Sequence, residues 1–189
     1  MKKAIIFLAL IFISLPTYSA GTIATYTIDA EKNAYEHNNK GLIFAEEKNY
    51  YGAIQEYKMA ISLNPKTQAT ATYFNNLGKV YLTIGYPELA LDCFNNAILQ
   101  YNLNFEFYQN LTECYKQLGQ LDSQLANYQE KTNISNNPFD RIMLGLLYEQ
   151  TGNKKKAIII LDEFVMSEPD LMITPAIKWH IQEIVDEII

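Results

Sequence analysis

The sequence predicts an all-helical fold, an α-solenoid of stacked helix-turn-helix units closed by a last helix. Three observations predict it: apolar residues recur at helical spacing, one pattern of residue sizes repeats about every 34 residues, and Gly or Pro separates successive patterns. Stacked units of this kind bury one continuous core. We expect four units, at 34–67, 71–104, 105–137 and 138–171, followed by a capping helix at 174–189.

Residues 1–19 have the composition of a secretory signal peptide. Two lysines precede an apolar run over residues 4–15, and small residues follow Pro16. The run is about a dozen residues, whereas a helix that crosses a bilayer needs about 20. We expect cleavage before Ala20, a periplasmic or secreted location, and no membrane span in the mature chain. Thr22 with Ala24 offers a second cleavage position. An uncleaved anchor or a buried first helix is the alternative, and no Cys directly follows the run to carry a lipid.

A lead-in segment is expected between the signal peptide and the first unit. It covers residues 20–33, and its first part, "AGTIATYTI" over residues 20–28, reads as extended chain.

The charge of the chain argues against several classes of partner. Removal of the two signal-peptide lysines takes the formal charge from −6 to −8. An acidic body with scattered lysines has no electrostatic footprint for nucleic acid or anionic lipid. We therefore expect a protein or peptide partner, no nucleic acid and no small-molecule cofactor.

Two cysteines, Cys93 and Cys114, are too few for a disulfide scaffold and lack the CxxC spacing of a redox or zinc motif. We expect two buried thiols, with a disulfide in an oxidising compartment as the alternative.

Four copies of the size pattern cover most of the chain after residue 33. Each copy has a small residue in its first helix, a turn residue, and then small, bulky and small positions in its second helix. The five columns hold Gly41, Gly78, Thr112 and Gly145; Lys48, Gly85, Gly119 and Gly152; Ala53, Ala90, Gln124 and Ala157; Tyr57, Phe94, Tyr128 and Leu161; and Ala60, Ala97, Lys131 and Phe164. Small side chains let two helix backbones approach closely, so the spacing serves the packing of a helix pair.

This pattern resembles the tetratricopeptide repeat family, over about Ala34 to Pro169. The resemblance implies a right-handed superhelix, an inner wall lined by the first helix of each unit, and binding of a protein partner in the resulting groove. The departures from the pattern are Lys40 before the first Gly, Lys48 at its turn, Gln124 and Lys131 in the third unit, and Phe164 in the fourth. They predict bulkier and looser contacts in the later units.

The segment after Pro169 predicts one more amphipathic helix. Thr174 is expected to cap it and Pro175 to occupy its first turn. An apolar stripe follows, formed by Ile177, Ile181, Ile184, Val185 and Ile188. We interpret it as the capping helix of the array, with a homodimer through Ile181 and Ile188 as the alternative. Trp179 lies beside the stripe and is expected to pack.

No constellation of residues predicts catalysis or metal binding. The two histidines, His37 and His180, fall at opposite ends of the array, whereas a nucleophile and its base must come within about 3 Å. Phosphate-loop, dinucleotide, zinc-protease and nucleophile-elbow motifs are missing from the sequence. We expect a protein that is not an enzyme and has no cofactor, metal site or catalytic residue.

The groove residues are predicted from the columns of the inner wall. Asn39, Asn76 and Asn110 recur two residues before the Gly column, and an amide can pair with a peptide backbone because it both donates and accepts. Family members with an asparagine ladder hold peptides in this way. The predicted set is Asn39, Asn75, Asn76, Lys79, Asn110 and Glu113. Local hydrogen bonding of the asparagines is the alternative.

The inner wall of the fourth unit is apolar where the others are polar, at Phe139, Ile142, Met143 and Leu146. It is either an anchor pocket for a partner side chain or a surface covered by the last helix, and we favour the cover. Only Lys79 and Lys116 are basic on the predicted wall, so a clamp for an acidic tail is not expected. The prediction is a non-catalytic adaptor of the cell envelope, with a structural subunit that oligomerises through its last helix or outer face as the alternative.

Overall fold

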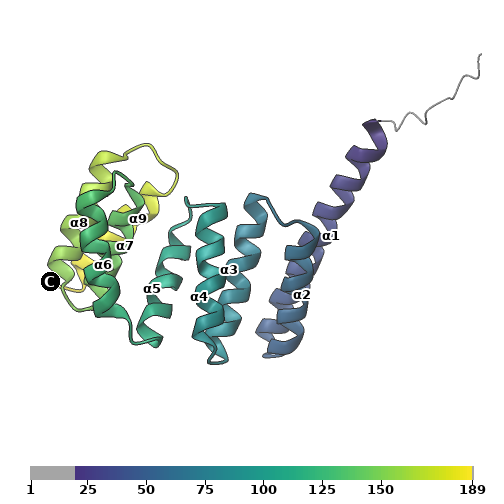
Figure 1. Ribbon diagram of the computed structural model, residues 1–189, viewed down its shortest axis with the longest axis horizontal. Helices are drawn as coiled ribbons and strands as arrows, with labels where there is room; N and C mark the ends of the chain where they lie inside the picture. The colour runs from purple at the N-terminus through teal and green to yellow at the C-terminus, as the bar shows by residue number, and fades with distance from the viewer. Residues whose placement is uncertain (1–19, 189) are drawn as a thin grey trace, which may run out of the picture.

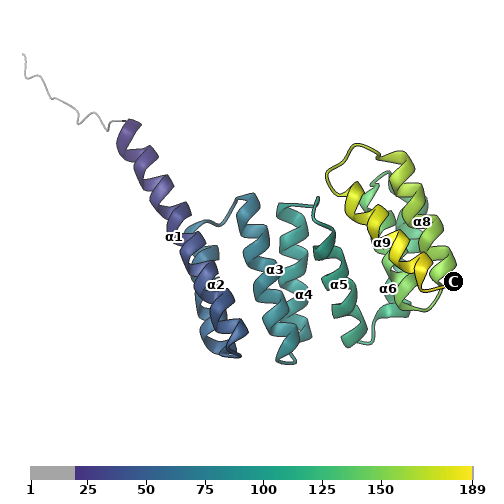
Figure 2. The same ribbon diagram turned by 180° about the vertical axis from the view of Figure 1, so that it is seen from behind.

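The computed structural model describes residues 20–188, with side chains from residue 29 onward. The predicted signal peptide therefore lies outside the described residues. Within residues 20–188 the chain forms nine helices arranged in a row (Figures 1 and 2). Their bounds are α1 Ala20–Glu46, α2 Tyr50–Leu63, α3 Gln68–Thr83, α4 Pro87–Gln100, α5 Phe105–Gln117, α6 Leu121–Ile134, α7 Phe139–Gln150, α8 Lys154–Ser167 and α9 Thr174–Asp186.

The expected extended lead-in is wrong, because residues 20–28 are helical and continue without a break into α1. Extending a helix that is already nucleated costs little, since each added residue gains a backbone hydrogen bond. Residues 34–46 pack against α2 and supply that nucleus, which outweighs the weak helix propensity of the Thr and Ile residues. Figure 1 shows the first turns of α1 projecting beyond α2.

The turns between paired helices lie at the predicted positions. Gly85, Gly119 and Gly152 have φ angles of 81°, 66° and 84°. Lys48 stands in the same column and has a φ of 59°. A side chain in this left-handed region costs free energy that glycine does not. The geometry of the turn is thus maintained in the first unit at the expense of a strained lysine.

Close packing within the helix pairs depends on the first glycine column. A Cβ atom at Gly41 would lie 2.6 Å from the Tyr57 ring, and one at Gly78 would lie 2.7 Å from the Phe94 ring. Both rings are almost fully buried. Contacts this short leave no room for a side chain, so these glycines allow α1 to pack on α2 and α3 to pack on α4.

The third unit is built differently. Thr112 replaces the glycine, is itself buried, and donates its hydroxyl hydrogen to the Tyr108 carbonyl oxygen at 2.8 Å. The helices α5 and α6 make little contact, and among the described residues α6 buries none of its own. Figure 1 shows α5 next to α4, with α6 grouped with α7 and α8. The looser contact predicted for this unit is therefore observed.

The core runs through the array and includes both thiols. Cys93 and Cys114 are free and buried, and the Cys114 thiol donates to the Pro87 carbonyl oxygen at 3.1 Å. Burial raises the pKa of Cys93 to about 12 and that of Cys114 to about 11, so both remain neutral near neutral pH. The structure thus shows two buried thiols, as predicted, and not the alternative disulfide.

The last helix begins differently from the prediction. Thr174 is the first residue of α9 rather than its cap, and it is fully buried. Its hydroxyl donates to the Glu168 carbonyl oxygen at 2.5 Å, at the end of α8. The carbonyl at a helix end needs a partner, and this contact supplies it while fixing the turn between α8 and α9.

Helix α9 covers the apolar wall of the fourth unit. Ile142, Met143 and Leu146 of α7 are buried in one core with Ile177 and Ile184 of α9. This agrees with the favoured prediction of a cover for Ile142 and Leu146, whereas Met143 also lines a cavity of about 370 Å³ together with Phe139 and Tyr108. Among residues 20–188, no helix is both long enough and apolar enough to span a membrane.

Candidate functional site

The predicted groove residues lie on three neighbouring first helices. We call the surface that they form on α1, α3 and α5 the inner face. Asn39 lies on α1, Asn75, Asn76 and Lys79 on α3, and Asn110 and Glu113 on α5. The helices run side by side in the order of the chain, as Figure 2 shows.

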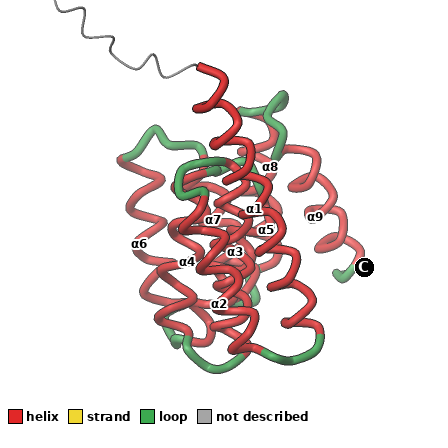
Figure 3. The backbone as a smooth tube through the Cα atoms, turned by 90° about the vertical axis from the view of Figure 1, so that its right-hand side faces the viewer, coloured by secondary structure: helices red, strands yellow, loops and turns green. Residues whose placement is uncertain are grey.

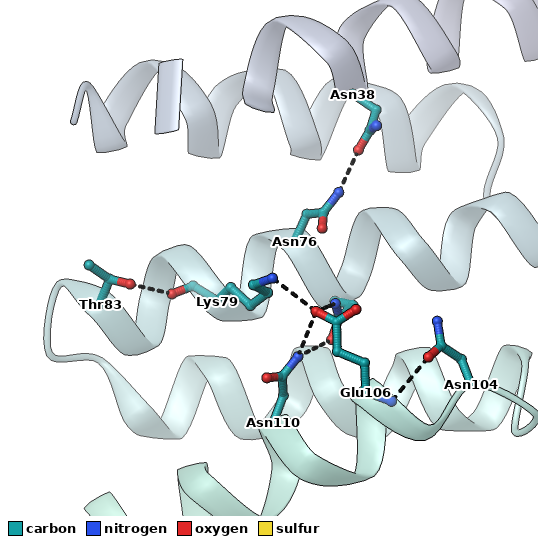
Figure 4. A network of polar contacts seen from close by, with 8 residues as sticks. Asn38, Asn76, Lys79, Thr83, Asn104, Glu106 and Asn110 are labelled. Carbon is teal, nitrogen blue, oxygen red and sulfur yellow. Dashed lines mark hydrogen bonds and ion pairs between the residues drawn. The ribbon is translucent and has the colours of Figure 1, made fainter. Parts of the chain in front are cut away.

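Two amides of the predicted ladder pair with buried amides of the preceding first helix. Asn76 donates from Nδ2 to Asn38 Oδ1 at 2.9 Å, and Asn110 donates from Nδ2 to Asn75 Oδ1 at 2.8 Å (Figure 4). Asn38 is 5% exposed and Asn75 is 2% exposed. The local hydrogen bonding that sequence analysis left open is therefore present. It also orients the half-buried Asn76 and Asn110, whose carbonyl oxygens accept no hydrogen bond from the described residues.

Glu106 is the centre of the network on α3 and α5. Its Oε1 accepts from Lys79 Nζ at 2.9 Å, from Asn75 Nδ2 at 3.4 Å and from Asn110 Nδ2 at 3.5 Å. Burial alone would raise the pKa of this carboxyl group, but the Lys79 hydrogen bond and charge and the two amides outweigh it and lower the pKa. Glu106 therefore stays ionised on the inner face.

The N-terminus of α5 helps to place Glu106. Asn104 caps this helix, because its Oδ1 accepts from the Glu106 backbone N–H at 3.0 Å (Figure 4). The Glu106 carboxylate also lies in the first turn, where the partial positive charge of the helix end favours an anion.

An apolar cavity opens beside the network. It has a volume of about 300 Å³ and lies between α1 and α3. Tyr57 and Val80 contribute buried apolar surface, and Asn76 and Lys79 stand at its polar side. A cavity of this size next to amide groups can hold one apolar side chain while the amides pair with the backbone that carries it.

The remaining predicted residues have lesser roles in this geometry. Asn39 is half-buried on α1. Glu113 accepts from Lys116 Nζ at 3.4 Å, within the same helix and on an exposed surface. Asn39 and Glu113 take no part in the hydrogen bond between Asn38 and Asn76, or in those that join Asn75, Asn110 and Glu106.

Two residues that matter were not in the predicted site. Asn38 supports Asn76, and Glu106 joins α3 to α5. The sequence did carry a signal for the first, because the pair Asn-Asn occurs at the same columns in the first two units. No repeated pair marked Glu106, whose contacts with Lys79 and Asn75 of α3 join residues 27 and 31 positions apart.

The far end of the inner face is closed by α9. His180 Nε2 lies 2.7 Å from Glu149 Oε2 of α7, and its ring centroid is 5.2 Å from that of Phe105 of α5. Because Ile177 and Ile184 face the core, the stripe leaves Ile181 half-buried and Ile188 43% exposed. The homodimer through Ile181 and Ile188 stays a prediction.

Comparison with known proteins identifies the repeats. The family model described as tetratricopeptide repeat matches residues 37–67, 71–100 and 141–171. The chain is a tetratricopeptide repeat protein. The matched ranges correspond to α1–α2, α3–α4 and α7–α8, and the third predicted unit lies between them. This tetratricopeptide repeat protein is thus most typical of its family where the helix pairs are closed.

Its relatives are distant. It is 24% identical over 131 residues to the BBSome complex member BBS4 of Bos taurus, a match that covers 69% of this chain and 25% of that protein. The chain therefore spans about a quarter of the length of this relative.

Two solved structures share the fold. A tetratricopeptide repeat protein from Parabacteroides merdae superposes with a TM-score of 0.50 at 18% identity, covering 82% of this chain and 61% of that one. The protein pilF of Pseudomonas aeruginosa superposes with a TM-score of 0.50 at 15% identity, covering 84% and 70%. At these identities the likeness concerns the fold alone.

Proposed function

We propose that the protein is a non-catalytic adaptor of the cell envelope that binds an extended segment of a partner protein along its inner face. The family supports the general role, because tetratricopeptide repeats serve protein interaction. The observation that carries the proposal is the oriented polar network of Asn76, Lys79, Glu106 and Asn110. These groups are held in place by buried amides and yet reach the surface, with Lys79 53% and Glu106 47% exposed.

The network suits the backbone of an extended segment. The amide carbonyls of Asn76 and Asn110 can accept from backbone N–H groups, while Lys79 can donate to a backbone carbonyl. Because Asn38 and Asn75 already fix the rotamers of the two ladder amides, little side-chain entropy is lost on binding. The cavity between α1 and α3 would take an apolar side chain of the same segment.

The location in the cell envelope rests on the composition of residues 1–19. A short Lys-Lys region followed by an apolar run and small residues supports export of the mature chain. Fractionation of cells that express the tagged full-length protein, with N-terminal sequencing of the mature form, tests this part. Recovery of the uncleaved chain from the cytoplasm would contradict it.

A capture experiment tests the binding face. The mature chain, immobilised beside a variant with Asn39, Asn76 and Asn110 changed to Ala, would be exposed to envelope extract. We expect a partner that the parent retains and the variant loses. The control variant carries Asn96→Ala and Asn127→Ala, which are exposed asparagines of α4 and α6 that bond only within their own helices. Equal capture by all three proteins would refute binding through the inner face.

A further inference from the structure

A second cavity lies at the far end of the inner face, between the start of α5 and α9. Its volume is about 600 Å³, and Figure 2 shows the two helices that flank it side by side. Three aromatic side chains, a thioether and two carboxylates line it: Tyr101, Phe105, Trp179, Met172, Glu106 and Glu183. Aromatic rings and carboxylates thus meet in one cleft, which we call the α5–α9 cleft.

Trp179 is presented to solvent at this cleft rather than packed, contrary to the expectation from the sequence. It is 72% exposed, although the adjacent stripe of α9 is buried. Its indole Nε1 donates to Glu183 Oε1 at 3.0 Å, one helical turn further along α9. This bond orients the indole N–H toward Glu183, and it leaves the aromatic face of Trp179 exposed at the cleft.

The two carboxylates that line the cleft, Glu106 and Glu183, outnumber its one basic side chain, His180, and so favour a cation. Glu183 accepts from Trp179 through Oε1 and lies 3.3 Å from His180 through Oε2. A second carboxylate, that of Glu149, lies 2.7 Å from the other ring nitrogen of His180, Nε2. On the α5 side, Glu106 is met by a single cation, Lys79, at 2.9 Å. Each carboxylate oxygen has two acceptor sites, so both Glu106 and Glu183 keep capacity for a further donor.

We propose that the α5–α9 cleft binds an arginine side chain of the partner segment that occupies the inner face. This inference rests on the proposed function and names the chemistry of its partner. A guanidinium can stack on the face of Trp179 and donate to a carboxylate at its edge in one pose. Lysine, a compact and strongly hydrated point charge, satisfies only one of these contacts well. The apolar rim formed by Leu103 and Met172 suits aliphatic neighbours of the arginine.

The overall charge of the protein agrees with this partner. The described chain carries an excess of Asp and Glu over Lys and Arg, which attracts a basic segment and repels an acidic one. Because Glu106 belongs both to the network of the inner face and to the cleft, one extended segment can satisfy both at once.

Trp179 provides its own probe. It is the only tryptophan of the chain, so fluorescence excited at a wavelength that tyrosine does not absorb reports on this cleft. The mature protein would be titrated with a short acetylated peptide that has one arginine between leucines, and with the same peptide carrying citrulline, which has the same shape without the charge. We expect a saturable change of Trp179 emission with arginine and binding about tenfold weaker, or more, with citrulline. Equal responses, or none to arginine, would overturn the proposal.

Variants locate the site. Glu183→Gln and Glu106→Gln should each weaken the arginine peptide about fivefold or more, while the control Glu130→Gln, on the exposed side of α6, should leave its affinity unchanged. Circular dichroism of each variant verifies that the helices remain folded. Unchanged affinity in both site variants would overturn the assignment. Sedimentation of the peptide-free protein detects a second copy in the cleft, and a concentration-dependent dimer that blocks the peptide would also overturn it.

The test separates this inference from the proposed function. If the arginine peptide fails while capture of the envelope partner still depends on Asn39, Asn76 and Asn110, only the arginine site is refuted. If the peptide binds the α5–α9 cleft but capture is indifferent to the asparagines, the route of the partner along the inner face is refuted and the arginine site is retained.

Discussion

The pair α3–α4 and the pair α5–α6 occupy equivalent places in the repeat but pack in opposite ways. In the first, Gly78 lets the Phe94 ring seat against the backbone of α3. In the second, Thr112 stands where that glycine is, and Tyr128 in the column of Phe94 is only partly buried. Figure 3, viewed along the row, shows α6 and α5 on different sides of the molecule. The residue at the point of closest approach thus differs between the closed pair and the open one.

The second-helix columns reinforce the difference. Ala90 and Ala97 are fully buried in α4, whereas their counterparts Gln124 and Lys131 in α6 are long and polar. Lys131 instead lies with its Nζ 4.4 Å from the centre of the Tyr128 ring. Polar side chains keep α6 solvated on one face and leave α5 to pack against α4 and α7. The helices of the open pair therefore pack mainly against other units, α5 against α4 and α7, and α6 against α7.

The largest expected effect comes from truncating the bulky column. Phe94→Ala should lower the free energy of unfolding by about 3–5 kcal/mol, because the ring is fully buried. Tyr128→Ala should cost about half of that or less, since this ring is only partly buried. Urea unfolding followed by circular dichroism compares the two. Equal losses would show that α6 is packed as tightly as α4 and would contradict the comparison.

Exchanging the residue at closest approach should have the next effect. Gly78→Thr should cost about 1–3 kcal/mol, because its Cβ would meet the Phe94 ring at 2.7 Å. Thr112→Ala, as the matched change in α5, should cost about 1 kcal/mol for its hydroxyl contact with Tyr108. The unfolding midpoints of both variants measure this. A neutral Gly78→Thr would mean that the glycine column does not set the approach of the helices.

The attachment of α9 should depend on pH through His180. Burial alone lowers the pKa of His180, but the hydrogen bonds and charges of Glu149 and Glu183 outweigh it and raise the pKa above its ordinary value of 6.5. A pKa raised on folding gives stability that is fully present below the unfolded value and is lost as pH rises through the folded one. Glu187, which is paired with Lys154, and Glu106 are further charged groups near this end of the molecule, as are Lys178 and Asp186 of α9 itself.

Two histidine variants test this dependence. Thermal unfolding of the parent should show a falling midpoint as pH rises from about 6 to 9, and His180→Gln should lose this slope and about 1–2 kcal/mol at the lower pH. His37→Gln, which changes the histidine beside Glu56 at the other end of the array, is the control and should keep the slope. If the unfolding midpoint of His180→Gln still falls as pH rises, the contact of His180 with Glu149 is not the source of the pH dependence.

The smallest expected effect concerns the turn column. Lys48→Gly should raise the free energy of unfolding by about 0.5–1 kcal/mol, because the lysine adopts a φ of 59° that glycine tolerates. Gly85→Lys places the opposite change in the second unit, where φ is 81°, and should lower the free energy of unfolding by about 1–2 kcal/mol. Urea midpoints that move in the same direction for both variants would contradict this explanation.

Much of the fold could be predicted because the repeat is a local pattern. Helix period, turn glycines and the three columns of the second helix are read from neighbouring residues, and they placed the paired helices and the looser third unit correctly. The errors fall where the chain meets something distant. Residues 20–28 were expected to be extended, but they prolong a helix that is nucleated by packing on α2. Thr174 was expected to cap α9 and instead binds the end of α8.

The candidate site was predicted in part. The columns identified Asn76, Lys79 and Asn110 as inner-face residues, because side chains at one column of successive first helices point the same way. Sequence alone left open whether the amides pair locally, and it missed Glu106 as their common partner. The contacts between helices join residues 27 to 38 positions apart in the chain, so they depend on the distance and angle between helices, which the local pattern does not specify.

By itself, the sequence determined the all-helical array, its repeat family, its acidic character and the glycine column that closes the first two pairs, because each follows from residue type and spacing along one helix or one turn. Only the tertiary structure decided that α9 lies beside the start of α5, that Trp179 stands exposed at a cleft with Glu106 and Glu183, and that buried amides orient the ladder. These features arise where helices of different units come into contact. Their relative positions depend on the packing of all the units between them, which the local sequence pattern does not specify.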